Sequence, residues 1–160
     1  MGVEIERKFL LRDEAILSQA ERVLTIRQGY IKKSSSLGVR IRVSDDKGFI
    51  TIKGSKAEGS IVRAEYEYEI PVQDALELLS ISGENVISKK RHHIRHDGML
   101  WEVDVFEGDN EGLVLAEVEL PDETADVSIP EWIGEEVTGS PEYYNSYLAL
   151  HPYTTWDEKK

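Results

Sequence analysis

Apolar and charged side chains alternate, one residue after another, through most of this 160-residue chain. The clearest case is Val39-Arg40-Ile41-Arg42-Val43, in which arginine takes every second position. Because a β-strand sends successive side chains to opposite faces, such a segment has one apolar face and one charged face. The pattern predicts eight strands, at residues 2–11, 24–33, 39–43, 49–54, 61–70, 86–95, 99–106 and 113–120.

Short turns join most of these segments, and two of them carry strong turn signals, at residues 45–48 and at Asp97-Gly98. Strands that follow one another through short turns pair antiparallel, and eight of them can close into a barrel. Helical spacing predicts three helices, at residues 12–21, after Pro71 and at residues 141–151. The predicted fold is therefore α+β, an eight-stranded antiparallel β-barrel with flanking helices.

Composition limits what such a barrel binds and where it works. The net charge of −12 disfavours general binding to nucleic acid or to an anionic membrane, so we expect neither among the partners. The absence of cysteine excludes disulfides and thiolate metal sites. No apolar run approaches the ~20 residues of a membrane span, and no secretory signal is evident. We expect a cytoplasmic protein with a single domain at residues 1–152 and a flexible tail at residues 153–160.

The charged faces are sorted by sign along the chain. The middle strands supply cations, which are Arg40, Arg42, Lys53, Arg63, Lys89 and Arg91. The first and last strands supply carboxylates, which are Glu4, Glu6, Glu117 and Glu119, with Asp104 on the strand before the last. Helices packed outside the barrel could bury the apolar faces, which would leave the charged faces to line an interior channel.

Closure of the barrel would make the first and last strands neighbours, so that four carboxylates converge. Such a group of oxygen donors suits a hard divalent cation, Mg²⁺ or Mn²⁺. Arginine and lysine on the opposite wall suit a polyanion that brings a metal with it, and phosphate chains are the obvious class. The alternative is a set of solvated faces with cross-strand ion pairs of little energetic weight. The same phase and sorted signs in six strands favour the interior site.

The segment Glu4-Ile5-Glu6-Arg7-Lys8 matches the ExExK signature of the CYTH domain, also called the triphosphate tunnel metalloenzymes. The resemblance continues through Arg27-Gln28-Gly29-Tyr30, Val39-Arg40-Ile41-Arg42, Thr51-Ile52-Lys53, residues 63–69 and 101–106, Glu117-Val118-Glu119, residues 134–138, Tyr144-Asn145 and Leu148-Ala149. It implies an eight-stranded tunnel that binds triphosphates with a divalent metal. The chain most resembles the short bacterial tripolyphosphatase branch.

The resemblance also implies roles for individual residues. The metal ions would be held by Glu4, Glu6, Glu117 and Glu119, with Asp104 as a fifth candidate. The phosphate oxygens would be bound by Lys8, Arg40, Arg42, Lys53, Arg63, Lys89 and Arg91. Tyr30 with Lys8 would form a catalytic dyad near the leaving group, the alternative being that Tyr30 only packs. Glu65 and Glu67 would either orient cations of the tunnel or hold a second metal.

The predicted function is a metal-dependent hydrolase of small-molecule triphosphates, with inorganic tripolyphosphate as the first candidate substrate. Three alternatives remain open: a class IV-type adenylyl cyclase, a thiamine triphosphatase, and a polyphosphate- or nucleotide-binding module without catalysis. Four converging carboxylates argue against mere anion binding. If residues 141–151 close one mouth of the tunnel, a short inorganic chain fits best. The sequence leaves the oligomeric state open, a homodimer included.

Overall fold

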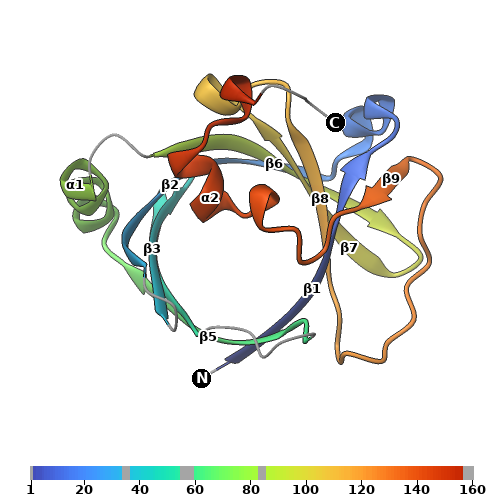
Figure 1. Ribbon diagram of the computed structural model, residues 1–160, viewed down its shortest axis with the longest axis horizontal. Helices are drawn as coiled ribbons and strands as arrows, with labels where there is room; N and C mark the ends of the chain where they lie inside the picture. Colours follow the sequence, from blue (N-terminus) through green and yellow to red (C-terminus); the bar gives the residue numbers. More distant parts are fainter. Residues whose placement is uncertain (1, 34–36, 55–59, 83–85, 157–160) are drawn as a thin grey trace.

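The computed structural model describes residues 2–33, 37–54, 60–82 and 86–156, so Met1, three predicted links and the last four residues lie outside the described residues. Eight antiparallel strands close into a barrel (Figure 1), which confirms the predicted fold. Around the barrel the order is β1, β5, β4, β3, β2, β6, β7, β8 and back to β1. The strands are β1 (Gly2–Leu11), β2 (Arg22–Lys33), β3 (Leu37–Ser44), β4 (Lys47–Gly54), β5 (Val62–Ile70), β6 (Ile87–His96), β7 (Met99–Phe106) and β8 (Val114–Glu119).

Strand β1 closes the barrel because it pairs with strands from both ends of the order. Its first half pairs with β5, with Glu4 opposite Arg63. Its second half pairs with β8, with Glu6 opposite Glu119 and Lys8 opposite Glu117. A ninth strand, β9 (Ile133–Glu136), pairs with the end of β1. It lies within residues 121–139, between the last strand predicted from the sequence and the predicted C-terminal helix.

The helical segments partly follow the predictions. Asp13 caps η1 (Glu14–Gln19) by accepting from the backbone N–H of Ala15, and α1 (Val72–Ser82) follows Pro71. Two further 3₁₀ turns are η2 (Gly108–Asn110) and η4 (Tyr153–Thr155). Within the described residues, no helix is long and apolar enough to span a membrane.

The helix predicted at residues 141–151 is wrong as one continuous element. The segment divides into η3 (Pro141–Tyr143) and α2 (Asn145–Leu150), because Tyr144 has an extended backbone with ψ of 137°. The predicted tail also starts too early, since Tyr153 is buried and the Trp156 ring lies 5.0 Å from the Tyr153 ring. Only residues 157–160 of that tail lie outside the described part of the chain.

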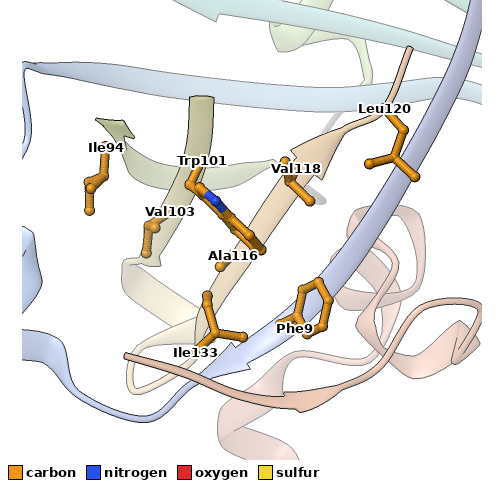
Figure 2. Close-up of a cluster of buried hydrophobic side chains, with 8 residues drawn as sticks. All are labelled: Phe9, Ile94, Trp101, Val103, Ala116, Val118, Leu120 and Ile133. Carbon is orange, nitrogen blue, oxygen red and sulfur yellow. The ribbon is translucent and has the colours of Figure 1, made fainter. Parts of the chain in front are cut away.

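Apolar faces of the barrel are covered from outside by different elements. Helix α1 packs on β3 through Ala75 and Leu79, which meet Ile41 and Val43. On the other side, η1 and β9 help to cover a cluster centred on Trp101, whose ring lies 5.6 Å from that of Phe9. Figure 2 shows this cluster of Phe9, Ile94, Trp101, Val103, Ala116, Val118, Leu120 and Ile133.

One end of the barrel is closed from inside. Along several strands the inward-facing positions change from charged to apolar, as from Lys8 to Leu10 in β1 and from Lys89 to Ile87 in β6. These apolar side chains pack with Tyr143 and Leu148 of the C-terminal segment, and α2 lies within the ring of strands in Figure 1. The C-terminal segment therefore stops the barrel at this end and leaves the charged part of the interior open.

The close approach of α1 to the sheet predicts a steric limit at Gly48. A Cβ atom at Gly48 would lie 2.7 Å from Cβ of Ala75, so alanine there must push α1 away from β4. We expect Gly48→Ala to lower the free energy of unfolding by ~1–3 kcal/mol, measured by urea denaturation. Gly38→Ala is the matched control, because no atom of the described residues lies within 4 Å of its added Cβ; an equal loss there would contradict the steric explanation.

Candidate functional site

A cavity of about 470 Å³ lies inside the barrel and is lined by the charged faces of the strands. Its carboxylates are Glu4, Glu6, Glu65, Glu67, Glu102, Glu117 and Glu119, and its cations are Lys8, Arg40, Arg42, Lys53, Arg63, Lys89 and Arg91. Every site residue predicted from the sequence lines this cavity, apart from Asp104. Because seven carboxylates face seven cations, the cavity suits an anion that carries its own cation better than either ion alone.

Three arginines are only partly satisfied by the described residues, although Arg40 contacts Thr51 and Glu67 through Nη2. The Nε atoms of Arg40 and Arg63 are buried and bond to no described residue. Arg42 donates from Nε to Gln28 Oε1 at 2.8 Å, and within the described residues it has no ion pair. Burial lowers the pKa of Arg42 to about 9, with further repulsion from Arg40 and Arg91. This wall therefore carries positive charge that a bound anion would stabilise.

Asp104 lies behind the cavity wall, where it holds two of the cations. Its carboxylate accepts from Arg91 Nε and Nη2 at 2.7 and 2.8 Å, and it pairs with Lys89 Nζ at 2.7 Å. Burial alone would raise the pKa of Asp104, but Arg91 and Lys89 lower it to about 2. The structure thus does not bring Asp104 together with the other predicted metal ligands; it positions Arg91 and Lys89 instead.

The carboxylates on the opposite wall are crowded. Burial raises the pKa of Glu6 to about 8, and the negative charges of Glu117 and Glu4 add to this shift. Burial also raises the pKa of Glu65 to about 7, helped by its hydrogen bond with Glu4. A divalent cation would relieve this repulsion, and carboxylate oxygens are the donors that Mg²⁺ and Mn²⁺ prefer. The donor chemistry therefore fits such an ion.

The carboxylates are not arranged as a finished metal site. Among the described residues, no three Asp, Glu or His side chains form a group that could hold an ion as they stand. Lys53 Nζ lies 2.9 Å from Glu4 Oε2 and 3.5 Å from Glu65 Oε2. Glu117 likewise has Lys8 at 3.6 Å and Arg91 at 3.9 Å. A metal ion at Glu4 must therefore compete with the ammonium group of Lys53.

Lys8 and Tyr30 both line the cavity, but in the described chain no hydrogen bond joins them. Lys8 Nζ donates to the backbone oxygen of Tyr143 at 3.2 Å. Burial lowers the pKa of Lys8, but Glu117 and Glu6 raise it more, so the net shift is upward and the ammonium stays charged. The Tyr30 hydroxyl accepts from Gln28 Nε2 at 3.2 Å. Their pairing as a catalytic dyad stays a prediction.

Glu65 and Glu67 contact cations of the tunnel. Glu65 lies 3.5 Å from Lys53, and Glu67 lies 3.5 Å from Arg40 while accepting from Thr51 Oγ1 at 2.8 Å. Both side chains therefore hold cations in place, in line with the first of the two roles considered for them.

Sequence reasoning missed several polar residues of the cavity. These are Gln28, Glu102, Thr138, Tyr144, Asn145 and Ser146. Gln28 could have been found, because it lies two residues before Tyr30 on the same strand and so shares its face. Thr138, Tyr144 and Asn145 also carried a signal, because they lie in segments that resemble the CYTH domain, whereas Ser146 lies in none of them.

Asp104 provides a stability test of this wall. We expect Asp104→Asn to lower the free energy of unfolding at pH 7 by ~3–5 kcal/mol, because Arg91 and Lys89 would stay buried without their counter-charge. The folded-state pKa of Asp104 lies below its ordinary value of 3.8, so this stabilisation is present above about pH 4 and is lost as the pH falls through about 2. Urea denaturation at pH 7, 4 and 2.5 should therefore show that the difference in free energy of unfolding between variant and wild type becomes smaller as the pH falls.

The control for this test is Asp109→Asn, which removes an exposed carboxylate. It should leave the free energy of unfolding within ~0.5 kcal/mol of wild type at pH 7. An Asp104 variant as stable as this control would show that the buried ion pairs do not support the cavity wall.

Known proteins match this chain over almost its whole length. The CYTH domain matches residues 2–146. A relative from Acetivibrio thermocellus named inorganic triphosphatase is 51% identical over 159 residues, which cover 99% of this chain and 100% of the relative. A relative of the same name from Nitrosomonas europaea is 38% identical over 152 residues, which cover 92% and 97%. The crystal structure of an inorganic triphosphatase superposes with a TM-score of 0.66 at 36% identity, and covers 92% of this chain and 97% of its own.

The superposition agrees with the barrel fold, and the sequence matches extend over nearly all of its strands. The chain belongs to the CYTH domain family.

Proposed function

We propose that this protein is a divalent-metal-dependent triphosphatase that hydrolyses inorganic tripolyphosphate inside the barrel. The observation that carries the proposal is the pairing of buried, unsatisfied arginines with crowded carboxylates in one cavity. Such a cavity fits a polyanion and a metal ion together. The names of the two relatives, both inorganic triphosphatases, support the same activity.

The phosphate chain would be bound by Lys8, Arg40, Arg42, Lys53, Arg63, Lys89 and Arg91. Arginine offers a planar fork that can contact two phosphate oxygens, whereas lysine acts as a point charge. Arg40 and Arg63 have buried Nε donors to satisfy, and a phosphate oxygen would satisfy them. Asp104 holds Arg91 and Lys89 in place from behind the wall.

Mg²⁺ or Mn²⁺ would be held by carboxylates of Glu4, Glu6, Glu117 and Glu119, with Glu65 close to Glu4. When bound, the ion supplies Lewis-acid stabilisation of the charge that develops on the phosphoryl group. Lys53 would leave Glu4 as the metal takes its place, and its ammonium would then be free to contact a phosphate.

The reaction would be an in-line attack of water on a terminal phosphorus, with cleavage of its bond to the bridging oxygen. The products would be orthophosphate and pyrophosphate. Lys8 is held by the Tyr143 carbonyl and by Glu117, and would stabilise negative charge on the leaving oxygen. The Tyr30 hydroxyl accepts from Gln28, which leaves its own proton available to donate to that oxygen.

The closed end of the barrel favours a short inorganic chain. Tyr143 and Leu148 pack against apolar side chains of the strands at that end, so a substrate with a bulky organic group must enter from the other mouth. Tripolyphosphate has no such group and would need only the charged section of the cavity.

The proposal predicts phosphate release from tripolyphosphate with Mg²⁺ or Mn²⁺, and none in excess EDTA. A colorimetric phosphate assay should give the highest kcat/KM for tripolyphosphate when ATP and thiamine triphosphate are tested beside it. Formation of cyclic AMP and pyrophosphate from ATP would favour the cyclase instead. Tight tripolyphosphate binding without turnover in either metal would favour a binding module.

Glu6→Gln separates metal binding from folding. The raised pKa of Glu6 means that the folded protein keeps a proton that the unfolded chain releases above its ordinary pKa of 4.5. In EDTA, wild-type stability should therefore fall as the pH rises from about 4.5 to about 8, and the variant should melt higher than wild type at pH 8.5. With Mn²⁺ the melting temperature should rise for wild type only, and turnover by the variant should be lost.

The matched control is Glu111→Gln, which removes an exposed carboxylate beyond η2. It should keep both turnover and the Mn²⁺-dependent rise in melting temperature. If Mn²⁺ raised the melting temperature of the Glu6 variant as much as that of wild type, Glu6 would not be a metal ligand.

A further inference from the structure

Asn145 lies in the cavity wall and has none of the metal-binding, phosphate-binding or catalytic roles described above. It is the first residue of α2 and lines the cavity beside Gln28, Arg42 and Lys89. Gln28 and Lys89 are almost completely buried, with exposed fractions of 0% and 1%. The surroundings of the Asn145 amide are therefore fixed rather than solvated.

The orientations of the Gln28 and Asn145 amide groups follow from Arg42 and Lys89, whose side chains donate hydrogen bonds and do not accept them. Arg42 Nε can only donate, so the Gln28 atom 2.8 Å away must be its oxygen, and the Gln28 nitrogen points to Asn145. Gln28 Nε2 then donates to Asn145 Oδ1 at 3.0 Å, and Lys89 Nζ donates to the same oxygen at 2.9 Å. Two independent donors converge on one Asn145 atom, so that atom is the oxygen.

The amide nitrogen of Asn145 is left for the cavity. Across the part of the chain that the structure describes, no group accepts a hydrogen bond from Asn145 Nδ2, and this atom is not among the buried polar atoms without a partner. It is therefore accessible, and the accessible space beside Asn145 is the cavity. The hydrogen bonds from Gln28 and Lys89 fix the Asn145 amide, so its two N–H groups point to the space that Arg42 and Lys89 line.

We propose that Asn145 is a further substrate-binding residue, whose amide N–H groups donate to a phosphate oxygen beside Arg42 and Lys89. The inference rests on the proposed function and adds a neutral donor to its cationic site. A neutral donor suits this place because Arg42, Lys89 and Arg91 already repel one another. Another cation here would cost stability, whereas an amide adds a hydrogen bond without charge.

Two substitutions distinguish contact with the phosphate from a structural role. Asn145→Asp is almost isosteric and keeps an oxygen for Gln28 and Lys89, but presents a second, anionic oxygen to the cavity in place of NH₂. Asn145→Ala removes the contacts with Gln28 and Lys89 as well as the donor, but adds no charge. If the amide faces the phosphate, tripolyphosphate binding weakens by at least about tenfold in the aspartate variant and less in the alanine variant.

A purely structural role predicts the reverse order, with the alanine variant weaker than an aspartate variant that binds like wild type. Isothermal titration calorimetry with tripolyphosphate in EDTA measures affinity without turnover, and thermal unfolding identifies a folding defect. We expect the aspartate variant to melt no lower than the alanine variant, because Lys89 keeps its partner. The control for added charge is Gln73→Glu on the exposed face of α1, which should bind like wild type.

The outcomes separate this inference from the function on which it rests. Wild-type protein that neither binds nor hydrolyses tripolyphosphate would overturn both. Turnover by wild type together with the reversed order of affinities, or with aspartate and control variants that bind alike, would overturn the role of Asn145 alone.

Discussion

Burial of charge inside the barrel is the constraint on which the rest of this structure depends. A carboxylate or ammonium group taken out of water costs several kcal/mol, about as much as a small domain gains in total by folding. The barrel meets this cost by bringing together opposite charges from different strands: Asp104 with Arg91 and Lys89, Lys53 with Glu4, and Lys8 with Glu117. What it leaves unpaired, above all Arg63 and Arg40 Nε, marks where a ligand must supply the missing charge.

The same strands also set where the charged interior stops. The inward faces of β1, β6, β7 and β8 change from charged to apolar toward one end, and Tyr143 and Leu148 of the C-terminal segment pack on this apolar surface. That packing brings Tyr144 and Asn145 to the cavity and the Tyr143 carbonyl to Lys8. The C-terminal segment therefore does two things: it closes one end of the barrel, and its backbone and side chains form part of the cavity wall.

Much of this could be predicted from the sequence because strand alternation is local. In each of the eight strands, the alternation of residues shows which side chains share a face. Closure of the barrel is predicted because the middle strands carry cations and the first and last strands carry carboxylates. Residues whose position depends on distant partners could not be predicted. Asp104 has the same phase as Glu102, yet it sits behind the wall because Arg91 and Lys89 lie over it. Strand β9 forms only because β1 offers it a free edge, and Tyr144 breaks the expected helix without any proline or glycine to signal it.

Lys53 connects the two ligands of the proposed reaction. Its ammonium pairs with Glu4 and Glu65. In the proposed reaction, a metal ion at Glu4 would displace this ammonium, which would then have the phosphate chain as an alternative anionic partner. A bound phosphate chain offers Lys53 that alternative and so weakens its hold on Glu4. Each ligand thereby lowers the cost of binding the other, and by linkage the effect is equal in both directions. In the proposed reaction, this balance of charges would favour the metal–triphosphate complex over either ion alone.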